Sequence, residues 1–239
     1  EGAGVCSHLL TDPHRPTTLK QRYRCKGKTL LRVSHLHQSD ISQKLQELLI
    51  QRLESILKQV DLLVFSDFNY GCLPDSVVQM VTALAKEHQV FIVADSQSSS
   101  QIGDVSRYKY TDLLTPTERE ARIALRDHNS GLVVLAEQLR ESTGSKNVLL
   151  KLGSEGVLIH ADGDEKENFY TDRIEALNNS PKDVAGAGDS MLITAAMALC
   201  VGGSIWNAAL LGSVAAGLQV GRLGNMPLQL DELLEAIQQ

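Results

Sequence analysis

Short apolar runs alternate with helical stretches along the chain, and this alternation restricts the fold more than any other feature. Runs at 62–65 and 90–94 are short and continuously apolar, and 148–152 is apolar apart from Lys151, so we expect buried strands there. Stretches with apolar residues at helical spacing lie between and after them, at 41–60, 74–88, 118–125, 132–141, 189–201, 204–220 and 230–239, and Ser39 or Asp40 is the expected cap of the first. Strands that alternate with helices predict an α/β fold, with a mostly parallel central sheet and helices on both faces.

The first part of the chain differs, because it is rich in β-forming residues. Segments 17–24 and 29–33 flank Lys26-Gly27, which predicts a hairpin turn. We therefore expect a small β flap over 14–34, attached to one main α/β domain, so that a single domain spans 1–239. No linker-like change of composition and no internal repeat divides the chain.

Charge and cysteine usage exclude several classes of function. The formal net charge is −6, which argues against a nucleic-acid-binding protein. The sequence contains no run of eighteen apolar residues, so no membrane span is expected. The four cysteines show no C-x-x-C spacing, so free thiols in a reducing cytoplasm are expected rather than zinc ligands or disulfides.

The sharpest local motif is D-V-A-G-A-G-D at 183–189, which is followed at once by an Ala-rich helical stretch. Glycines allow a tight turn, and amides at a helix N-terminus attract anions. An aspartate at such a site can accept a proton from a hydroxyl that attacks phosphorus, while the amides stabilise the transferred group. The alternative is an ordinary helix start with Asp as a capping residue.

This motif resembles the D-x-x-G-A-G-D signature of the ribokinase (PfkB) family of carbohydrate kinases. Other segments resemble motifs of that family in the same order, namely S-D-F-N-Y-G at 66–71, L-T-P-T-E-R-E-A at 114–121, L-G-S-E-G at 152–156 and V-A-A-G at 214–217. R-P-T-T-L-K-Q-R at 15–22, with L-L-R-V at 30–33, resembles the heptose-7-phosphate kinases within this family, the kinase half of bifunctional ADP-heptose synthases.

The resemblance implies a ribokinase-like three-layer sandwich that transfers phosphate from ATP, with Mg²⁺, to a sugar or sugar-phosphate hydroxyl. The acceptor it implies is O1 of heptose 7-phosphate. Asp189 would be the general base, and the amides of Gly186, Ala187 and Gly188 the anion hole. The remaining residues implied by position are Lys20, Arg32, Asp67 and Asp183 for the substrate, Lys151, Gly153, Gly156, Ser213 and Gly217 for the nucleotide, and Glu120 for the metal.

Each of these residues also has a plain structural explanation. Glu120 lies three residues after Thr117, the spacing of a capping box. Cations suit phosphate oxygens, yet Lys20, Arg22 and Arg32 are also what an exposed hairpin carries. Asp67 follows an apolar strand run, as does Asp95, where ligands bind in α/β sheets but where turns form too.

Several positions depart from the family pattern. Thr117 replaces the usual Asn, Ala185 a common Thr, Tyr70 a Lys, and Ser96-Gln97 a Pro-Lys pair. The alternative function is therefore a non-catalytic or divergent nucleotide-binding module that is fused to a partner domain or docks one. A kinase for a nucleoside, a fructose phosphate or a vitamin is a third hypothesis.

The resemblance also sets expectations for the whole protein. Family members begin with a strand and a G-G-x-x-x-N segment that this sequence does not show, so we expect a fold that lacks its N-terminal part and has an unpaired sheet edge. A small-molecule sugar phosphate is the expected partner. The flap strands favour a homodimer, and a fused nucleotidyltransferase domain is expected in the full-length protein.

Overall fold

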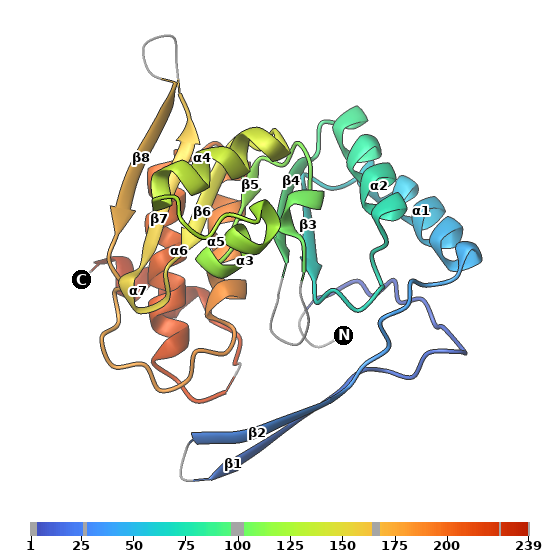
Figure 1. The fold of residues 1–239 in the computed structure, drawn as a ribbon, viewed down its shortest axis with the longest axis horizontal. Coiled ribbons are helices and arrows are strands. Elements are labelled where there is room, and N and C mark those ends of the chain that lie inside the picture. Colours follow the sequence, from blue (N-terminus) through green and yellow to red (C-terminus); the bar gives the residue numbers. More distant parts are fainter. Residues whose placement is uncertain (1–3, 26–27, 97–102, 164–167, 225, 239) are drawn as a thin grey trace.

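A six-stranded sheet forms the centre of the molecule (Figure 1). The computed structural model describes residues 4–25, 28–96, 103–163, 168–224 and 226–238. The strands, in spatial order, are β3 Leu62–Asp67, β4 Phe91–Ser96, β5 Leu113–Leu114, β6 Asn147–Lys151, β7 Val157–Asp162 and β8 Phe169–Ile174. Strands β3 to β6 are parallel, whereas β7 and β8 add antiparallel pairs at one edge. The predicted mostly parallel sheet is confirmed.

Helices cover both faces of this sheet. They are α1 Gln43–Leu57, α2 Asp75–Glu87, α3 Glu118–Leu125, α4 Leu132–Thr143, α5 Ala187–Cys200, α6 Ile205–Val220 and α7 Leu230–Gln238. Because side chains alternate along a strand, Ile92 and Val148 pack in one cluster with α1 to α4, while Val93 and Leu149 pack in a second with α5 and α6. This arrangement is the predicted three-layer sandwich.

The flap is a two-stranded antiparallel hairpin of β1, Leu19–Cys25, and β2, Lys28–His35. Figure 1 shows it projecting beyond the edge of the sheet at which β3 and β4 end. The predicted hairpin is confirmed, and its Lys26-Gly27 turn lies outside the described residues.

The root of the flap is fastened to the loop after β3. The guanidinium of Arg15 donates to the carbonyl oxygens of His37, Tyr70 and Gly71. Gly71 has a φ of +74°, and a Cβ on it would lie 2.2 Å from the carbonyl oxygen of Ser39. Only glycine fits there, since a side chain would push the two segments apart.

Three local features differ from the sequence predictions. Helix α1 is capped by Ser42, whose hydroxyl accepts from the Leu45 amide, and not by Ser39 or Asp40. Helix α5 begins at residue 187, so the Gly-rich turn already enters its first turn. Strand β8 was not predicted because its residues 171–173 are exposed and polar, which hides the usual apolar signal.

The helices and the β3 edge of the sheet bear on two further expectations, one about a membrane span and one about an unpaired strand. Among the described residues, no helix is long and apolar enough to cross a bilayer. Within the same residues, the sheet ends at β3, which pairs on one side with β4. The expected unpaired edge is therefore present in this part of the chain.

Candidate active site

The start of α5 forms the predicted Gly-rich turn. Gly186 is the N-cap residue and has φ 82° and ψ −4°, a left-handed conformation that favours glycine. The helical ladder begins where the Ser190 amide donates to the Gly186 carbonyl at 2.9 Å, so the amides of residues 187–189 precede it. The Ala187 amide contacts the Val184 carbonyl at 3.4 Å. Asp189 lies in the first helical turn.

Two polar side chains hold this turn in place. The carboxylate of Asp183 accepts from the amides of Ala185, at 3.2 Å, and Gly224, at 3.3 Å. Gln219 is 1% exposed, and its amide nitrogen donates to the carbonyl oxygens of the same two residues. These contacts support a role for Asp183 in shaping the turn. Gln219 was not predicted from the sequence, although a lone glutamine within a mostly apolar helix was a signal.

Lys151, the last residue of β6, points to the same turn. Its ammonium nitrogen lies 3.0 Å from each carboxylate oxygen of Asp95 on β4. A Cβ placed on Gly188 would be 3.2 Å from that nitrogen. The structure thus brings a cation, a carboxylate and the start of α5 together at the carboxyl ends of the parallel strands, where α/β folds bind ligands.

Glu120 is buried in a capping box at the start of α3. One carboxylate oxygen accepts from the Thr117 amide at 2.7 Å, and the Thr117 hydroxyl accepts from the Glu120 amide at 3.2 Å. The structural explanation of this pair is confirmed, while its metal role stays a prediction. The described residues contain no group of three or more His, Cys, Asp or Glu side chains suited to a metal ion.

The two glycines of the predicted nucleotide turn, between β6 and β7, differ in their surroundings. Gly153 has φ +65°, and a Cβ on it would meet nothing within 4 Å. Gly156 has φ +92°, and a Cβ there would lie 2.0 Å from the Ile174 carbonyl oxygen. Gly153 therefore borders open space that a ligand can enter, whereas Gly156 permits close packing of the chain against β8.

Gly217 on α6 lines a cleft of about 490 Å³ between α6, α7 and the 178 loop. Its carbonyl oxygen accepts from the Asn178 side chain at 2.9 Å. One turn earlier, Ser213 is 6% exposed, and its hydroxyl has no hydrogen-bond partner among the described residues. The cleft and this hydroxyl lie one turn apart on α6, the helix that the resemblance places beside the nucleotide.

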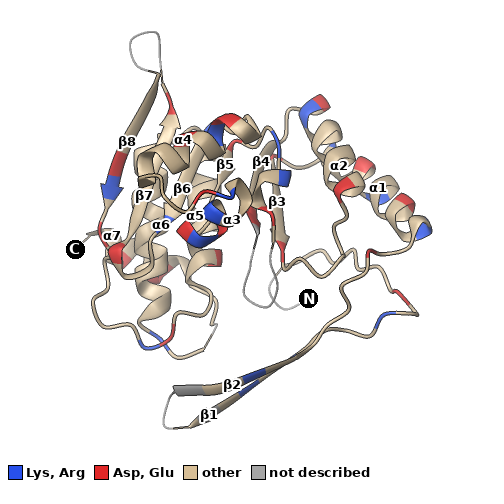
Figure 2. Ribbon diagram, viewed as in Figure 1, with Lys and Arg blue, Asp and Glu red and all other residues tan. Residues whose placement is uncertain are grey.

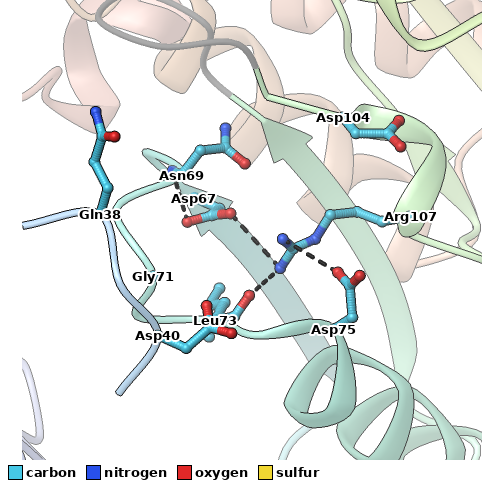
Figure 3. Close-up of a pocket in the computed structure, with 9 residues that line it drawn as sticks. All are labelled: Gln38, Asp40, Asp67, Asn69, Gly71, Leu73, Asp75, Asp104 and Arg107. Carbon is cyan, nitrogen blue, oxygen red and sulfur yellow. Dashed lines mark hydrogen bonds and ion pairs between the residues drawn. The ribbon is translucent and has the colours of Figure 1, made fainter.

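Asp67 faces a different pocket, of about 280 Å³, on the α2 side of the sheet (Figure 3). Its carboxylate accepts from the Asn69 amide and from the Tyr108 hydroxyl, each at 2.9 Å, and lies 3.8 Å from Arg107. Burial, with Asp67 adjacent, raises the pKa of the Tyr108 phenol.

The charge of this pocket is mainly negative. Four carboxylates line it, those of Asp40, Asp67, Asp75 and Asp104, against the single guanidinium of Arg107. Such a lining disfavours a phosphate group. Asp67 also extends from β3 toward the face opposite α5, so the structure does not bring it to the Gly-rich turn.

Cations on the flap are arranged on one of its faces. Arg22 pairs directly opposite Arg32 across the hairpin, and Lys20 lies on the same face. The Lys20 ammonium lies 4.1 Å from the ring centre of Phe68 and 4.9 Å from that of Tyr70. Figure 2 shows Lys and Arg positions on both flap strands and no Asp or Glu among them. Two cations directly opposite each other on a sheet repel. An anion bound between them would relieve that repulsion, so this face suits an anion.

Comparison with known proteins supports the resemblance found in the sequence. The chain is 30% identical to the bifunctional protein HldE of Paramagnetospirillum magneticum over 233 residues, and the match covers 96% of the chain and 46% of that protein. The Helicobacter hepaticus protein of the same name is 29% identical, with 99% and 48% covered. The chain thus spans about half the length of these relatives.

Solved structures share the fold. Ribokinase from Thermotoga maritima is 25% identical with a TM-score of 0.61, covering 78% of this chain and 59% of that one. Giardia lamblia ribokinase has a TM-score of 0.70 at 22% identity, with 93% and 72% covered. The profile of the pfkB family carbohydrate kinases matches residues 1–231. With its three-layer fold and its Gly-rich turn at the start of α5, the chain belongs to the pfkB family of carbohydrate kinases.

Proposed function

We propose that this chain transfers the γ-phosphoryl group of ATP to a hydroxyl of a sugar phosphate, with Asp189 as the general base. The observation that carries the proposal is the convergence at the α5 turn, where Gly188 meets the ammonium of Lys151 and Asp189 lies in the first helical turn. Asp189 accepts the proton of the acceptor hydroxyl, whose oxygen bonds to the γ-phosphorus as the bond to ADP breaks. The 186–188 turn stabilises the charge on the transferred group.

Features of the described residues fit the nucleotide. Gly153 borders open space and Gly217 lines a cleft, and both glycines belong to segments next to the turn. The buried Ser213 hydroxyl has no hydrogen-bond partner among the described residues. Mg²⁺ commonly binds through one or two carboxylates, waters and the phosphates themselves. Glu120 would hold it in this way, because an ion bound largely by waters and phosphates needs no cluster of protein ligands.

The flap supplies what the acceptor phosphate needs. Lys20, Arg22 and Arg32 share one face, while the pocket at Asp67 is too acidic for phosphate. We therefore place the acceptor between flap and α5, with heptose 7-phosphate as the acceptor of choice. The resemblance of the R-P-T-T-L-K-Q-R segment to the heptose-7-phosphate kinases supports that choice.

Replacement of Asp189 by Asn tests the assignment of the base. Removing a general base lowers kcat by about 100- to 10,000-fold, so we expect a loss of that size with ATP and heptose 7-phosphate. Asp231→Asn is the matched control, because Asp231 also lies in the first turn of a helix, α7. Equal turnover in the Asp189 variant and the control would refute this role.

The same assay separates the other hypotheses. A panel of ribose, fructose 6-phosphate, a nucleoside and heptose 7-phosphate identifies the acceptor. Calorimetry with ATP and Mg²⁺ is run beside it. Tight ATP binding without transfer to any acceptor would favour the nucleotide-binding module. That hypothesis is considered because Thr117 departs from the family pattern.

We also propose how the chain associates. Leu19, Tyr23 and Leu31 lie on the flap face opposite the cations, and each is more than half exposed. Exposed apolar patches mark interaction sites, and a second copy would cover this one. Replacing Tyr23 with Asp should shift the sedimentation coefficient to that of a monomer. Because the match covers only 46% of one HldE protein, we further propose a fused partner domain in the full-length protein, which the resemblance implies is a nucleotidyltransferase.

A further inference from the structure

The strongest unexplained feature near the turn is the ion pair of Asp95 and Lys151. Both carboxylate oxygens contact the ammonium at 3.0 Å. The side chains are only 4% and 15% exposed. A buried ion pair adds little net stability, because removal of both charges from water offsets their attraction. Its presence at the carboxyl edge of the sheet therefore calls for a role other than stability.

The pair also has an unusual position in the sheet. Asp95 and Lys151 are on β4 and β6, which are separated by β5. Strand β5 is only two residues long, Leu113–Leu114, so the lysine side chain reaches across the region beyond its end. By strand alternation both residues lie on the face of Val93 and Leu149, which packs against α5.

Asp95 fixes a side chain that is otherwise flexible. A lysine has four rotatable bonds and three N–H donors. Two of those donors reach Asp95, which leaves the third for another acceptor. The ammonium is thereby held 3.2 Å from the Cβ position of Gly188, at the turn where the phosphates of the donor are proposed to bind.

We propose that Asp95 is a positioning residue, which aims the Lys151 ammonium at the phosphates of ATP. The inference rests on the proposed kinase function and adds a residue that acts through Lys151. The Lys151 ammonium neutralises phosphate charge at the α5 turn. Because Asp95 already holds the lysine side chain in place, that side chain loses less conformational freedom when ATP binds. Neutralising Asp95 should weaken ATP binding while the KM for the acceptor stays near its original value.

A double-mutant cycle on the full chain tests this coupling, with ATP affinity measured by calorimetry without acceptor. Lys151→Met should weaken ATP binding about 10- to 100-fold, the worth of a charge-assisted hydrogen bond. Asp95→Asn should weaken it about 3- to 10-fold in the original chain. In the Lys151→Met background, Asp95→Asn should have no further effect, since the residue acts through the lysine.

Two further variants serve as controls. Lys146→Met breaks an ion pair with Asp112 at the opposite end of the same strand, where Lys146 is 69% exposed, and should leave ATP affinity unchanged. Lys151→Arg keeps the charge and should bind ATP more tightly than Lys151→Met. Thermal unfolding confirms that each variant is folded.

The outcomes separate this inference from the function on which it rests. Additive losses in the cycle, or an unaffected Lys151→Met variant, would overturn the positioning role while kinase activity stands. A chain that binds no ATP at all would overturn both. An inactive Asp189→Asn variant that still binds ATP leaves the cycle fully measurable.

Discussion

Gly156 provides a direct test of how the turn between β6 and β7 is built. Its φ of 92° and ψ of −132° lie in a region that side-chain-bearing residues hardly populate. A Cβ would also stand 2.0 Å from the Ile174 carbonyl oxygen and 2.7 Å from the Glu175 carbonyl carbon. The substitution Gly156→Ala therefore meets two independent costs, one in the backbone and one in packing.

The size of the effect follows from these two costs. A disallowed backbone conformation costs about 1–3 kcal/mol. Ordinary contact between non-bonded atoms begins near 3.5 Å, so the turn and the residues after β8 must separate by more than about 1 Å. Val157 pairs with Ile174 at this end of the ladder, so the β7–β8 pairing would be strained as well. Together we expect a loss of about 3–5 kcal/mol in the free energy of unfolding.

The assay is urea unfolding of the whole chain, followed by circular dichroism. Gly153→Ala is the matched control, because Gly153 has φ +65° in the same turn with nothing within 4 Å of its Cβ position. It should cost only about 1–2 kcal/mol. A Gly156→Ala variant no less stable than the Gly153→Ala control would refute the packing explanation. The glycine would then have to be explained by nucleotide contact alone.

Two further perturbations test other parts of the structure. Arg15→Ala removes the contacts that fasten the flap root to the loop after β3. The Ile41 amide donates to the Gly71 carbonyl in that loop, so its hydrogen exchange reports on the attachment. Exchange there should accelerate about tenfold, which corresponds to the loss of one hydrogen bond. Arg52→Ala, which removes contacts to the carbonyls of residues 8 and 9, should leave that exchange unchanged; equal acceleration in both would refute the flap-root role. The Arg140 guanidinium lowers the pKa of Glu137. The Glu137 carboxylate therefore stabilises the fold fully at pH values above the usual glutamate pKa, and this stabilisation is lost as the pH falls through the lowered pKa. The difference in unfolding free energy between the original chain and Glu137→Gln, roughly 1 kcal/mol at pH 7, should therefore shrink in acid, and a pH-independent difference would contradict the ion pair.

Local sequence patterns predicted most of the elements. Apolar periodicity located the helices from α1 to α7 and the strands β3, β4 and β6, because both signals depend on neighbouring residues alone. The two residues of β5 were too few to give such a signal. Strand β8 was missed since its outward residues, such as Asp172, are polar and exposed. The cap of α1 was misplaced because Ser39, Asp40 and Ser42 are all suitable caps, and only the path of the chain from the flap selects Ser42.

Contacts between distant residues were beyond such patterns. Arg15 reaches the carbonyl of Tyr70, and Lys151 reaches Asp95, and in each case the partner is more than fifty residues away in sequence. The identities of these residues gave no hint of their partners. The family motifs located the α5 turn, yet only coordinates place Lys151 beside Gly188.

Strand alternation explains why the predicted site residues separate into two groups. Asp95 shares the face of Val93, toward α5, whereas Asp67 shares the face of Phe65, toward α2. Two aspartates at neighbouring strand ends therefore serve different sides of the sheet. Asp95 meets a cation beside the proposed phosphoryl-transfer turn, and Asp67 lies in an acidic pocket. Because that pocket repels phosphate, the positive charge for a sugar phosphate has to come from elsewhere. In the proposed function the cationic face of the flap supplies it, so we expect the position of the flap to control binding of the acceptor.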